Sequence, residues 1–325
     1  MQFLSHKTSI GKQMKSISIV IPCYHCEASI KELTEEILQT FEGTDIKWEA
    51  ILVNDGSTDK TWQEISQLAK KYNWVTGINL SRNFGQHNAL YAGILATKNE
   101  LIVTMDDDLQ HSPADIIPLI STIEKNYDLV YATPEEEQHS KFRNIASVTT
   151  KYLLEKTLNI PRASDTSAFR IFNSQLIDVF KHHIGPFVDI DAILAWGTKR
   201  VGTITVQFRK RKYGQSNYSV LSLISHTIKM IESYSQVPLR ISSMMGVIFF
   251  LFGMALLIRV LSNYYIYGGA VEGFTFLAVI IIIFSGIQLL AIGIIGEYIG
   301  RLHQRSMGKP IFLIREKIDS SKNLK

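Results

Sequence analysis

The stretch LIVTMDDDLQHSP, residues 101–113, joins an apolar run to a cluster of three carboxylates. The apolar run predicts a buried strand, so the carboxylates are expected at that strand's C-terminal end. Like charges this close raise one another's pKa values, and a folded protein normally keeps such a cluster where a cation neutralises it. Hard oxygen ligands favour Mg²⁺ or Mn²⁺, which commonly hold a diphosphate. The alternative is an acidic loop that caps a helix starting near Pro113.

The sequence before this stretch alternates between strand-like and helix-like patterns. We expect strands at 16–22, 48–54, 75–80 and 101–105, and helices at 29–41, 61–72 and 86–96. Such alternation predicts an α/β fold with a mostly parallel, doubly wound, Rossmann-like sheet, whose ligands lie at the carboxyl ends of the strands.

Each of the four predicted strands ends in a polar or turn-forming segment, at residues 22–24, 54–56, 81–85 and 106–110. A nucleotide would suit this edge, because Tyr24 can stack on a base and Asp55 can accept from a base N–H. Neither of the two commonest glycine-rich phosphate-binding motifs is present. We therefore expect the acidic cluster to hold the diphosphate through a metal ion.

The two cysteines, Cys23 and Cys26, have the spacing C-x-x-C. They could form a redox pair or half of a zinc site, but no second Cys or Cys/His pair with zinc-ribbon spacing completes four ligands. The alternative is two reduced thiols at a strand end.

Taken together, these segments resemble the GT-A-fold, family 2 inverting glycosyltransferases. The resemblance spans about residues 16–316. The most similar branch contains the membrane-anchored polyprenyl-phosphate glycosyltransferases, such as the bactoprenol glucosyltransferases, the undecaprenyl-phosphate aminoarabinose-type transferases and the dolichol-phosphate mannose synthases. The motifs that carry it are IVIPCY (19–24), VNDGSTD (53–59), NFGQ (83–86), DDDLQHSP (106–113) and GIIGEYIGR (293–301).

The resemblance implies a donor site for a nucleoside diphosphate sugar, with a UDP-sugar expected. Its metal ligands would be Asp106, Asp108 and Gln110, holding Mg²⁺ or Mn²⁺. The family often has Asn-Glu after the tyrosine, where this chain has His-Cys-Glu, so the nucleotide-contacting glutamate is either displaced to Glu27 or lost. The full set of expected nucleotide-sugar contacts is Pro22, Tyr24, Glu27, Val53, Asp55, Asp106, Asp107, Asp108 and Gln110.

The resemblance also places Arg143 and Ser147 at the phosphate of the acceptor lipid, where a guanidinium can clamp phosphate oxygens. The alternative is a solvated basic helix end. Relatives have an arginine soon after the preceding strand, where this chain has PEEE at 134–137. Two further cations, Arg209 and Arg211, lie in the basic run 209–212.

Two acids are candidates for the catalytic carboxylate. Asp165 opens DTSAFR, which matches a family segment except that Ala168 replaces its second aspartate, and Asp191 precedes Gly202 by the spacing seen around the base of soluble relatives. The alternative for each is a helix cap or a surface acid.

Two apolar segments, 241–261 and 274–295, are long enough to cross a hydrocarbon core of about 30 Å. The alternative, a buried core helix, fits poorly because 279–284 is apolar on all faces. The linker 262–273 has no Lys or Arg, whereas both flanks are basic, so the linker is expected outside and the catalytic domain in the cytoplasm. The remaining segments are expected to be a disordered lead (1–15), the catalytic domain (16–215), an amphipathic juxtamembrane segment (216–240) and a cytoplasmic tail (296–325).

A net charge of +4 is too small to argue for nucleic acid. The basic run 209–212 leads directly into the amphipathic segment, so lipid phosphates are the expected partners.

The resulting hypothesis is an enzyme of the bacterial inner membrane that transfers a sugar, with inversion, from a nucleoside diphosphate sugar to a polyprenyl phosphate, expected to be undecaprenyl phosphate. The resemblance implies a homo-oligomer, a tetramer. Two alternatives remain: a processive polysaccharide synthase of the same fold, and a membrane-anchored nucleotide-sugar-binding protein with a decayed site.

Overall fold

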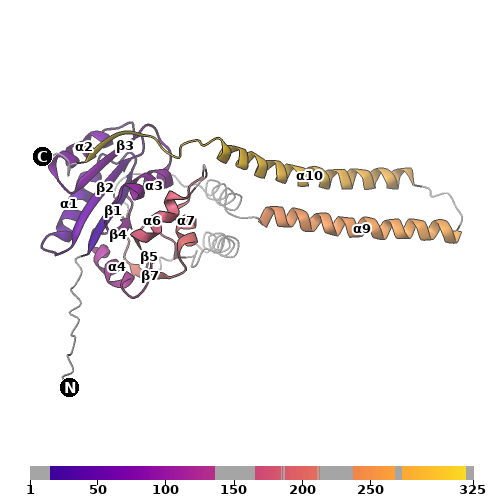
Figure 1. Ribbon diagram of the computed structural model, residues 1–325, viewed down its shortest axis with the longest axis horizontal. Helices are drawn as coiled ribbons and strands as arrows, with labels where there is room; N and C mark the ends of the chain where they lie inside the picture. Colours follow the sequence, from indigo (N-terminus) through magenta and orange to yellow (C-terminus); the bar gives the residue numbers. More distant parts are fainter. Residues whose placement is uncertain are drawn as a thin grey trace, which may run out of the picture.

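The computed structural model describes residues 15–135, 165–183, 185, 187–210, 212, 237–267 and 273–319. In these ranges the chain forms one mixed sheet covered by helices on both faces, and two long helices that extend away from it (Figure 1).

The sheet has eight strands in the order β7-β5-β6-β4-β1-β2-β3-β8. Pairings are parallel for β1 with β2 and β4, β2 with β3, and β5 with β7, and antiparallel for β4 with β6, β5 with β6, and β3 with β8. The strands are β1 (Ser16–Cys23), β2 (Lys47–Asn54), β3 (Val75–Leu80), β4 (Leu101–Thr104), β5 (Leu129–Pro134), β6 (Arg170–Asn173), β7 (Val201–Val206) and β8 (Ile314–Asp319). The predicted α/β sheet is confirmed, with more antiparallel pairing than the sequence indicated.

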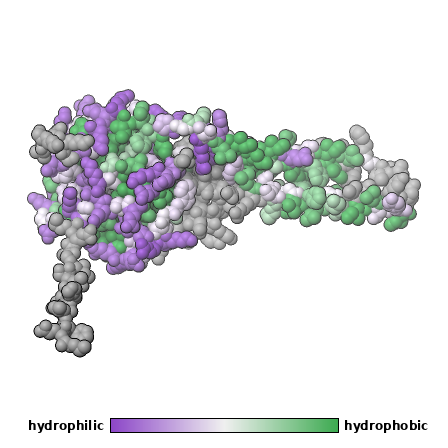
Figure 2. Space-filling model, in the orientation of Figure 1, coloured by the Kyte–Doolittle hydropathy of each residue, from purple (hydrophilic) through white to green (hydrophobic). Residues whose placement is uncertain are grey.

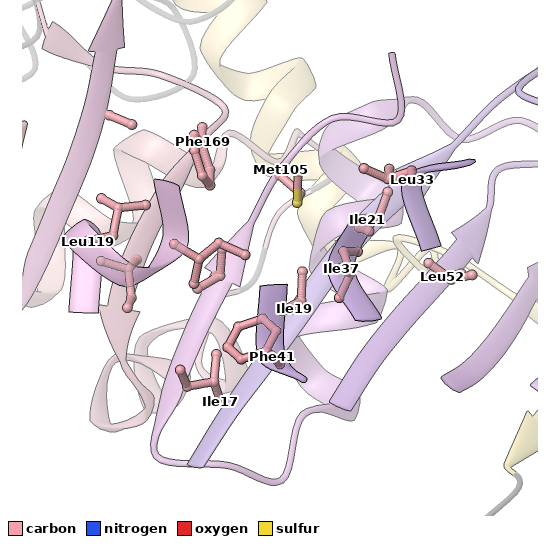
Figure 3. Close-up of a cluster of buried hydrophobic side chains, with 14 of the residues drawn as sticks. Ile17, Ile19, Ile21, Leu33, Ile37, Phe41, Leu52, Met105, Leu119 and Phe169 are labelled. Carbon is pink, nitrogen blue, oxygen red and sulfur yellow. The ribbon is translucent and has the colours of Figure 1, made fainter. Parts of the chain in front are cut away.

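The helices of the first hundred residues begin and end within one or two residues of their predicted positions. Helices around the sheet are α1 (Ile30–Phe41), α2 (Thr61–Lys71), α3 (Gln86–Ala96), α4 (Ile116–Ile123), α6 (Ile177–Lys181) and α7 (Ile190–Gly197), with 3₁₀ turns η1 (Pro113–Asp115) and η3 (Ser174–Leu176). Because side chains alternate along a strand, β1 directs Ile19 into the core under α1, α2 and α4, and Val20 into the core under α3, α6 and α7. Figure 3 shows the first of these cores.

Burial of the core side chains fixes the sheet. Ile17, Ile19 and Ile37 are completely buried, and each contributes roughly 1.5–3 kcal/mol relative to an exposed position. These contacts hold α1 and α4 against β1 and so set where the loops at the carboxyl edge of the sheet begin.

Two long helices follow the domain, α9 (Val237–Tyr267) and α10 (Phe274–Ser306). Each holds an apolar window, Ser242–Asn263 and Ile283–Ser306, that is long enough to cross a membrane by length and composition, and none of either window is buried. Figure 2 shows the apolar surface that these helices carry, in contrast with the largely polar surface of the domain. The second window begins later in the chain than the expected span 274–295.

The C-terminal segment returns to the catalytic sheet. β8 pairs antiparallel with β3, and Trp62 Nε1 donates to Glu316 Oε2 at 3.2 Å. We expected the catalytic domain to end at residue 215, so the sequence analysis did not predict this strand. Both ends of the helical pair are therefore attached to one domain (Figure 1). The lead 1–14, nearly all of 216–240, and 268–272 of the linker lie outside the described residues.

Candidate functional site

The sheet topology gathers the polar segments at one edge. β1, β2 and β4 are mutually parallel neighbours, so Tyr24, Asp55 and Asp106 follow strands that end at the same edge. β6 runs the opposite way, and its first residue, Arg170, is in register with Thr104 at the end of β4. The buried guanidinium of Arg170 therefore lies beside the acidic loop, because β6 is the neighbour of β4 in the sheet.

The acidic loop contains an unusual backbone turn at Leu109. This leucine has φ 63°, in the left-handed region, while only 2% of its surface is exposed. A non-glycine residue in this region costs roughly 1–2 kcal/mol, which burial of the side chain offsets. The Gln110 N–H donates to Asp108 Oδ1 at 3.1 Å across the turn. Burial of Leu109 thus anchors the loop that presents the neighbouring carboxylate.

The three carboxylates have different partners. Asp106 Oδ1 accepts from Gln86 Nε2 at 2.7 Å, whereas Asp107 Oδ2 accepts from the Tyr24 N–H at 3.1 Å. Burial, with smaller contributions from the two flanking carboxylates, raises the pKa of Asp107 to about 6. Asp107 is thus directed toward the end of β1, whereas Asp106 contacts the start of α3 and Asp108 contacts the turn at Leu109.

This donor set fits a hard divalent metal. Mg²⁺ and Mn²⁺ are typically held by one or two carboxylates together with substrate phosphate oxygens. The nearby His111 does not neutralise the pair, because burial lowers its pKa and the ring is packed against Phe169 and Phe208. Its Nδ1 accepts from the Asp106 N–H at 3.3 Å. The assignment of Asp106, Asp108 and Gln110 as the ligands of such an ion stays a prediction.

Asp55 organises the loop that follows β3. Its two carboxylate oxygens accept from the Phe84 N–H at 2.7 Å and the Gly85 N–H at 2.8 Å, and burial raises its pKa. Gly56, with φ 65°, permits the contact, because a Cβ there would lie 2.2 Å from the Arg82 carbonyl carbon. Each carboxylate oxygen has a second lone pair, so Asp55 can still accept a hydrogen bond from a base, as expected.

A stacked aromatic pair stands at the end of β1. Tyr24 is 45% exposed, and its ring lies over His25 with centroids 4.2 Å apart and planes at 14°. His25 has φ 54° and is held by hydrogen bonds to Ser57 and Thr58. Sequence reasoning did not identify His25 as a site residue, although it lies between Tyr24 and Glu27. The pair is a preformed surface for stacking a planar ring.

The structure describes the surroundings of three other residues that were expected to contact the nucleotide. Pro22 and Val53 are buried and lie opposite each other in the β1–β2 register, and their expected nucleotide contacts stay predictions. Glu27 Oε2 accepts from the Lys60 N–H at 2.8 Å, at the start of α2. Glu27 thus accepts from a backbone N–H at the N-terminus of α2, and its expected nucleotide contact stays a prediction.

The cysteines meet a third possible ligand. Ligand atoms of Cys23, Cys26 and Asp107 all lie within 4.8 Å of one another. The pKa of Cys23 is raised chiefly by burial, and that of Cys26 by its hydrogen bond with Cys23 and by burial. Metal ligation and redox chemistry both require a thiolate. These shifts favour the interpretation of two buried, reduced thiols.

The two catalytic candidates differ in their contacts. Asp191, in the first turn of α7, is paired with the guanidinium of Arg170 and accepts from the Tyr131 hydroxyl at 2.7 Å. Arg170 has 3% of its side chain exposed; burial opposes its charge, but Asp191 and other acids outweigh that and raise its pKa. Asp165 is half-buried in the segment leading into β6. The structure thus brings Asp191 to the buried arginine, and the role of Asp165 stays a prediction.

The start of α7 is tied to the start of α3. Asp189 caps α7 by accepting from the Ala192 N–H at 2.9 Å, and His87 Nδ1 accepts from the Ile190 N–H at 3.2 Å. Because Gln86, next to His87, holds Asp106, one helix end links the acidic loop to α7. Sequence reasoning did not single out Gln86, His87, His111, Tyr131 or Asp189. Gln86 and His111 both lie inside quoted motifs, which was the available signal.

Most of the expected acceptor site lies outside the described residues, including Arg143, Ser147 and Arg211. Arg209 is described, and its NH1 donates to Glu36 Oε1 at 2.8 Å while its NH2 donates to Ser112 at 3.1 Å. Lys212 likewise contacts Glu32 at 2.7 Å. The described part of the basic run therefore packs on the acidic face of α1, and the expected phosphate contact of Arg209 stays a prediction.

Comparisons with known proteins agree with this geometry. A model of the family described as "Glycosyl transferase family 2" matches residues 18–183. A relative from Photorhabdus laumondii named undecaprenyl-phosphate 4-deoxy-4-formamido-L-arabinose transferase is 31% identical over 316 residues, which cover 96% of this chain and 97% of the relative. A relative of the same name from Proteus mirabilis is 31% identical over 319 residues, which cover 97% of each chain.

Among solved structures, a glucosyl-3-phosphoglycerate synthase from Mycobacterium tuberculosis in complex with Mn²⁺, UDP-glucose and phosphoglyceric acid matches with a TM-score of 0.51. It is 18% identical, and the match covers 68% of this chain and 78% of that one. This likeness confirms the expected GT-A fold.

Proposed function

This chain belongs to glycosyl transferase family 2 and is a glycosyltransferase, and we propose that it transfers a sugar from a nucleoside diphosphate sugar to a polyprenyl phosphate, with inversion at the anomeric carbon. The observation that carries the proposal is the match to undecaprenyl-phosphate transferases over 96% of the chain, which includes both long helices. Undecaprenyl phosphate is accordingly the acceptor we propose, and a UDP-sugar the donor.

The donor would lie across the carboxyl edge of the sheet. Tyr24 stacks on the base, and the free lone pairs of Asp55 accept from it. Asp106 and Asp108, with Gln110, would hold Mg²⁺ or Mn²⁺. When bound, the ion neutralises the diphosphate and stabilises the charge that develops on it as it leaves. The Mn²⁺ and UDP-glucose named for the mycobacterial synthase support this choice.

The reaction needs little help from a base. An oxygen of the acceptor phosphate forms the new bond to the anomeric carbon, while the bond from that carbon to the donor diphosphate breaks and its electron pair leaves with the diphosphate. A phosphate monoester has a second pKa of about 6, so the nucleophile is already anionic near neutral pH. Asp191 then acts as a positioning residue that holds Arg170 beside the acidic loop, and Arg143 with Ser147 would orient the acceptor phosphate.

The membrane arrangement is also part of the proposal. Both long helices would span the bacterial inner membrane, and the pairing of β8 with β3 supports an even number of crossings, because two strands of one sheet occupy one compartment. Basic residues flank the apolar segments on the domain side, which supports a cytoplasmic catalytic domain. Nothing in the described contacts bears on the expected oligomer.

The test is incubation of the purified full chain with radiolabelled nucleotide sugars and polyprenyl phosphate. Formation of a labelled glycolipid supports the proposal. A labelled polymer would instead identify a processive synthase, and binding of donor without any product would identify a nucleotide-sugar-binding protein. Polyprenol without phosphate is the matched control, and it should accept no sugar because it lacks the anionic nucleophile.

A further inference from the structure

A cavity of about 290 Å³ lies where α10 ends and the chain turns back toward the sheet. Three segments form it: the residues after α6, the last turn of α10, and the connection from α10 to β8. Its lining residues are His183, Gly185, Gln304, Arg305, Gly308, Lys309, Pro310, Ile311 and Phe312. None of them belongs to the site described above, so the cavity is a separate feature of the molecule.

The cavity is positively charged. Arg305 and Lys309 line it, and among the lining residues that the structure describes none carries a carboxylate. The pKa of His183 is lowered chiefly by burial, and the nearby Arg305 lowers it further, which places the guanidinium close enough to disfavour a second positive charge. The positive charge that would attract an anion here is therefore that of Arg305 and Lys309.

The partial negative charge at a helix C-terminus normally disfavours an anion, and the backbone of this turn reduces that effect. The Met307 N–H donates to the His303 carbonyl at 3.0 Å and the Gly308 N–H to the Arg305 carbonyl at 3.2 Å. These two carbonyl oxygens at the end of α10 are therefore already hydrogen-bonded. Gly308 has φ 61°, and this left-handed turn directs Lys309 and the following residues along the cavity wall.

One wall of the cavity is apolar. Ile311 and Phe312 pack against the core under α3, and the Phe312 ring lies 6.2 Å from that of Tyr91. On the other side of His183, the ring of Trp196 is 6.1 Å away, and 56% of this tryptophan is exposed. Cations beside an apolar wall, with an exposed tryptophan nearby, are typical of the interfacial region of a membrane.

The position along α10 agrees with this. The apolar window of α10 ends at Ser306, so Arg305 and Lys309 lie at the C-terminal end of this helix. Figure 1 shows that α10 returns to the catalytic domain at this end. We propose that this cavity binds the phosphate of an anionic phospholipid headgroup, with Arg305 and Lys309 as its cationic contacts and Ile311 and Phe312 against the glycerol backbone. The lipid would fill the angle between α10 and the catalytic domain. The inference does not depend on sugar transfer, because it concerns binding alone.

The test is native mass spectrometry of the full chain in neutral detergent, titrated separately with phosphatidylglycerol, phosphatidylcholine and polyprenyl phosphate. The cavity variant is Arg305→Gln with Lys309→Gln. The charge-matched control is Lys70→Gln with Lys317→Gln, which removes two exposed cations outside the cavity. We expect the native chain to retain phosphatidylglycerol over phosphatidylcholine, the cavity variant to bind it at least about tenfold more weakly, and the control to bind it as the native chain does.

Thermal unfolding of each variant checks that it is folded, and Lys309→Gln alone serves if the double variant is not. A phosphatidylglycerol preference that survives in the cavity variant, or that falls equally in the control, would overturn the proposal. So would a cavity effect confined to polyprenyl phosphate, because that result would assign the cavity to the acceptor.

Discussion

The carboxylate of Asp191 in α7 is paired with the buried guanidinium of Arg170 at the start of β6. The Tyr131 hydroxyl donates to the same carboxylate at 2.7 Å. A carboxylate engaged by two donors is better suited to holding a cation in place than to removing a proton. These contacts favour a positioning role for Asp191, and the role as a base that the sequence spacing suggested stays a prediction.

We expect Asp191→Asn to lower the free energy of unfolding by about 3 kcal/mol, because it removes the carboxylate that is paired with the buried Arg170. Combining it with Arg170→Met should cost less than the sum of the two single changes, since neither member of the pair is then left without the other. Denaturant unfolding measures both. Asp178→Asn, which opens an exposed pair with Lys181, is the control and should change stability little. An Asp191→Asn variant of normal stability that loses two or more orders of magnitude in kcat would indicate a general base instead.

Metal dependence can be tested at Asp108. Asp108→Asn keeps an oxygen to accept from the Gln110 N–H but removes the charge, so turnover should fall about 100-fold or more while circular dichroism is unchanged. EDTA should abolish native activity, and Mg²⁺ or Mn²⁺ should restore it. The exposed Asp45→Asn is the charge-matched control. Full activity in EDTA would remove the metal assignment.

The stacked pair at the end of β1 should contribute to donor binding. Tyr24→Ala is expected to raise the KM for the nucleotide sugar roughly tenfold, because stacking on a base contributes about 1–3 kcal/mol. Tyr24→Phe keeps the ring and should be nearly normal. The KM for polyprenyl phosphate is the internal reference and should not change. Equal effects of the two substitutions would mean that the hydroxyl, and not the ring, contacts the donor.

The acceptor site is tested by comparing two arginines. Arg143→Ala should raise the KM for polyprenyl phosphate roughly tenfold or more, since a charge-assisted contact with phosphate contributes about 1.5–3 kcal/mol. Donor binding should be unaffected. Arg209→Ala should leave both KM values near normal, because its guanidinium is held by Glu36 and Ser112. The reverse result, with the acceptor effect at Arg209, would move the phosphate site to the basic run.

The pairing of β8 with β3 leads to a prediction about topology. Protease added to inside-out vesicles should cut both the catalytic domain and the segment after Arg301, and right-side-out vesicles should protect both. A cleavage site inserted at residue 270, between α9 and α10, should show the opposite pattern. Access to the domain and to the C-terminal segment from opposite faces would mean that one helix does not span.

The sequence alone determined the elements of the first hundred residues, the GT-A fold and the family. Its local patterns were sufficient there, because β1, β2 and β4 are buried apolar runs ended by polar turns, and parallel topology brings such ends together. The family motifs then located Asp55 and Asp106 at one edge. Two apolar helices could likewise be recognised from composition and length.

Tertiary structure decided how those residues are used. The three carboxylates of the acidic loop look equivalent in sequence, but the left-handed turn at Leu109 and the Tyr24 N–H separate Asp107 from the other two. The pairing of Arg170 with Asp191 joins β6 to α7, and β8 joins the far end of the chain to β3. These contacts depend on strand order and on burial across long sequence separations, and no local pattern of residues encodes either.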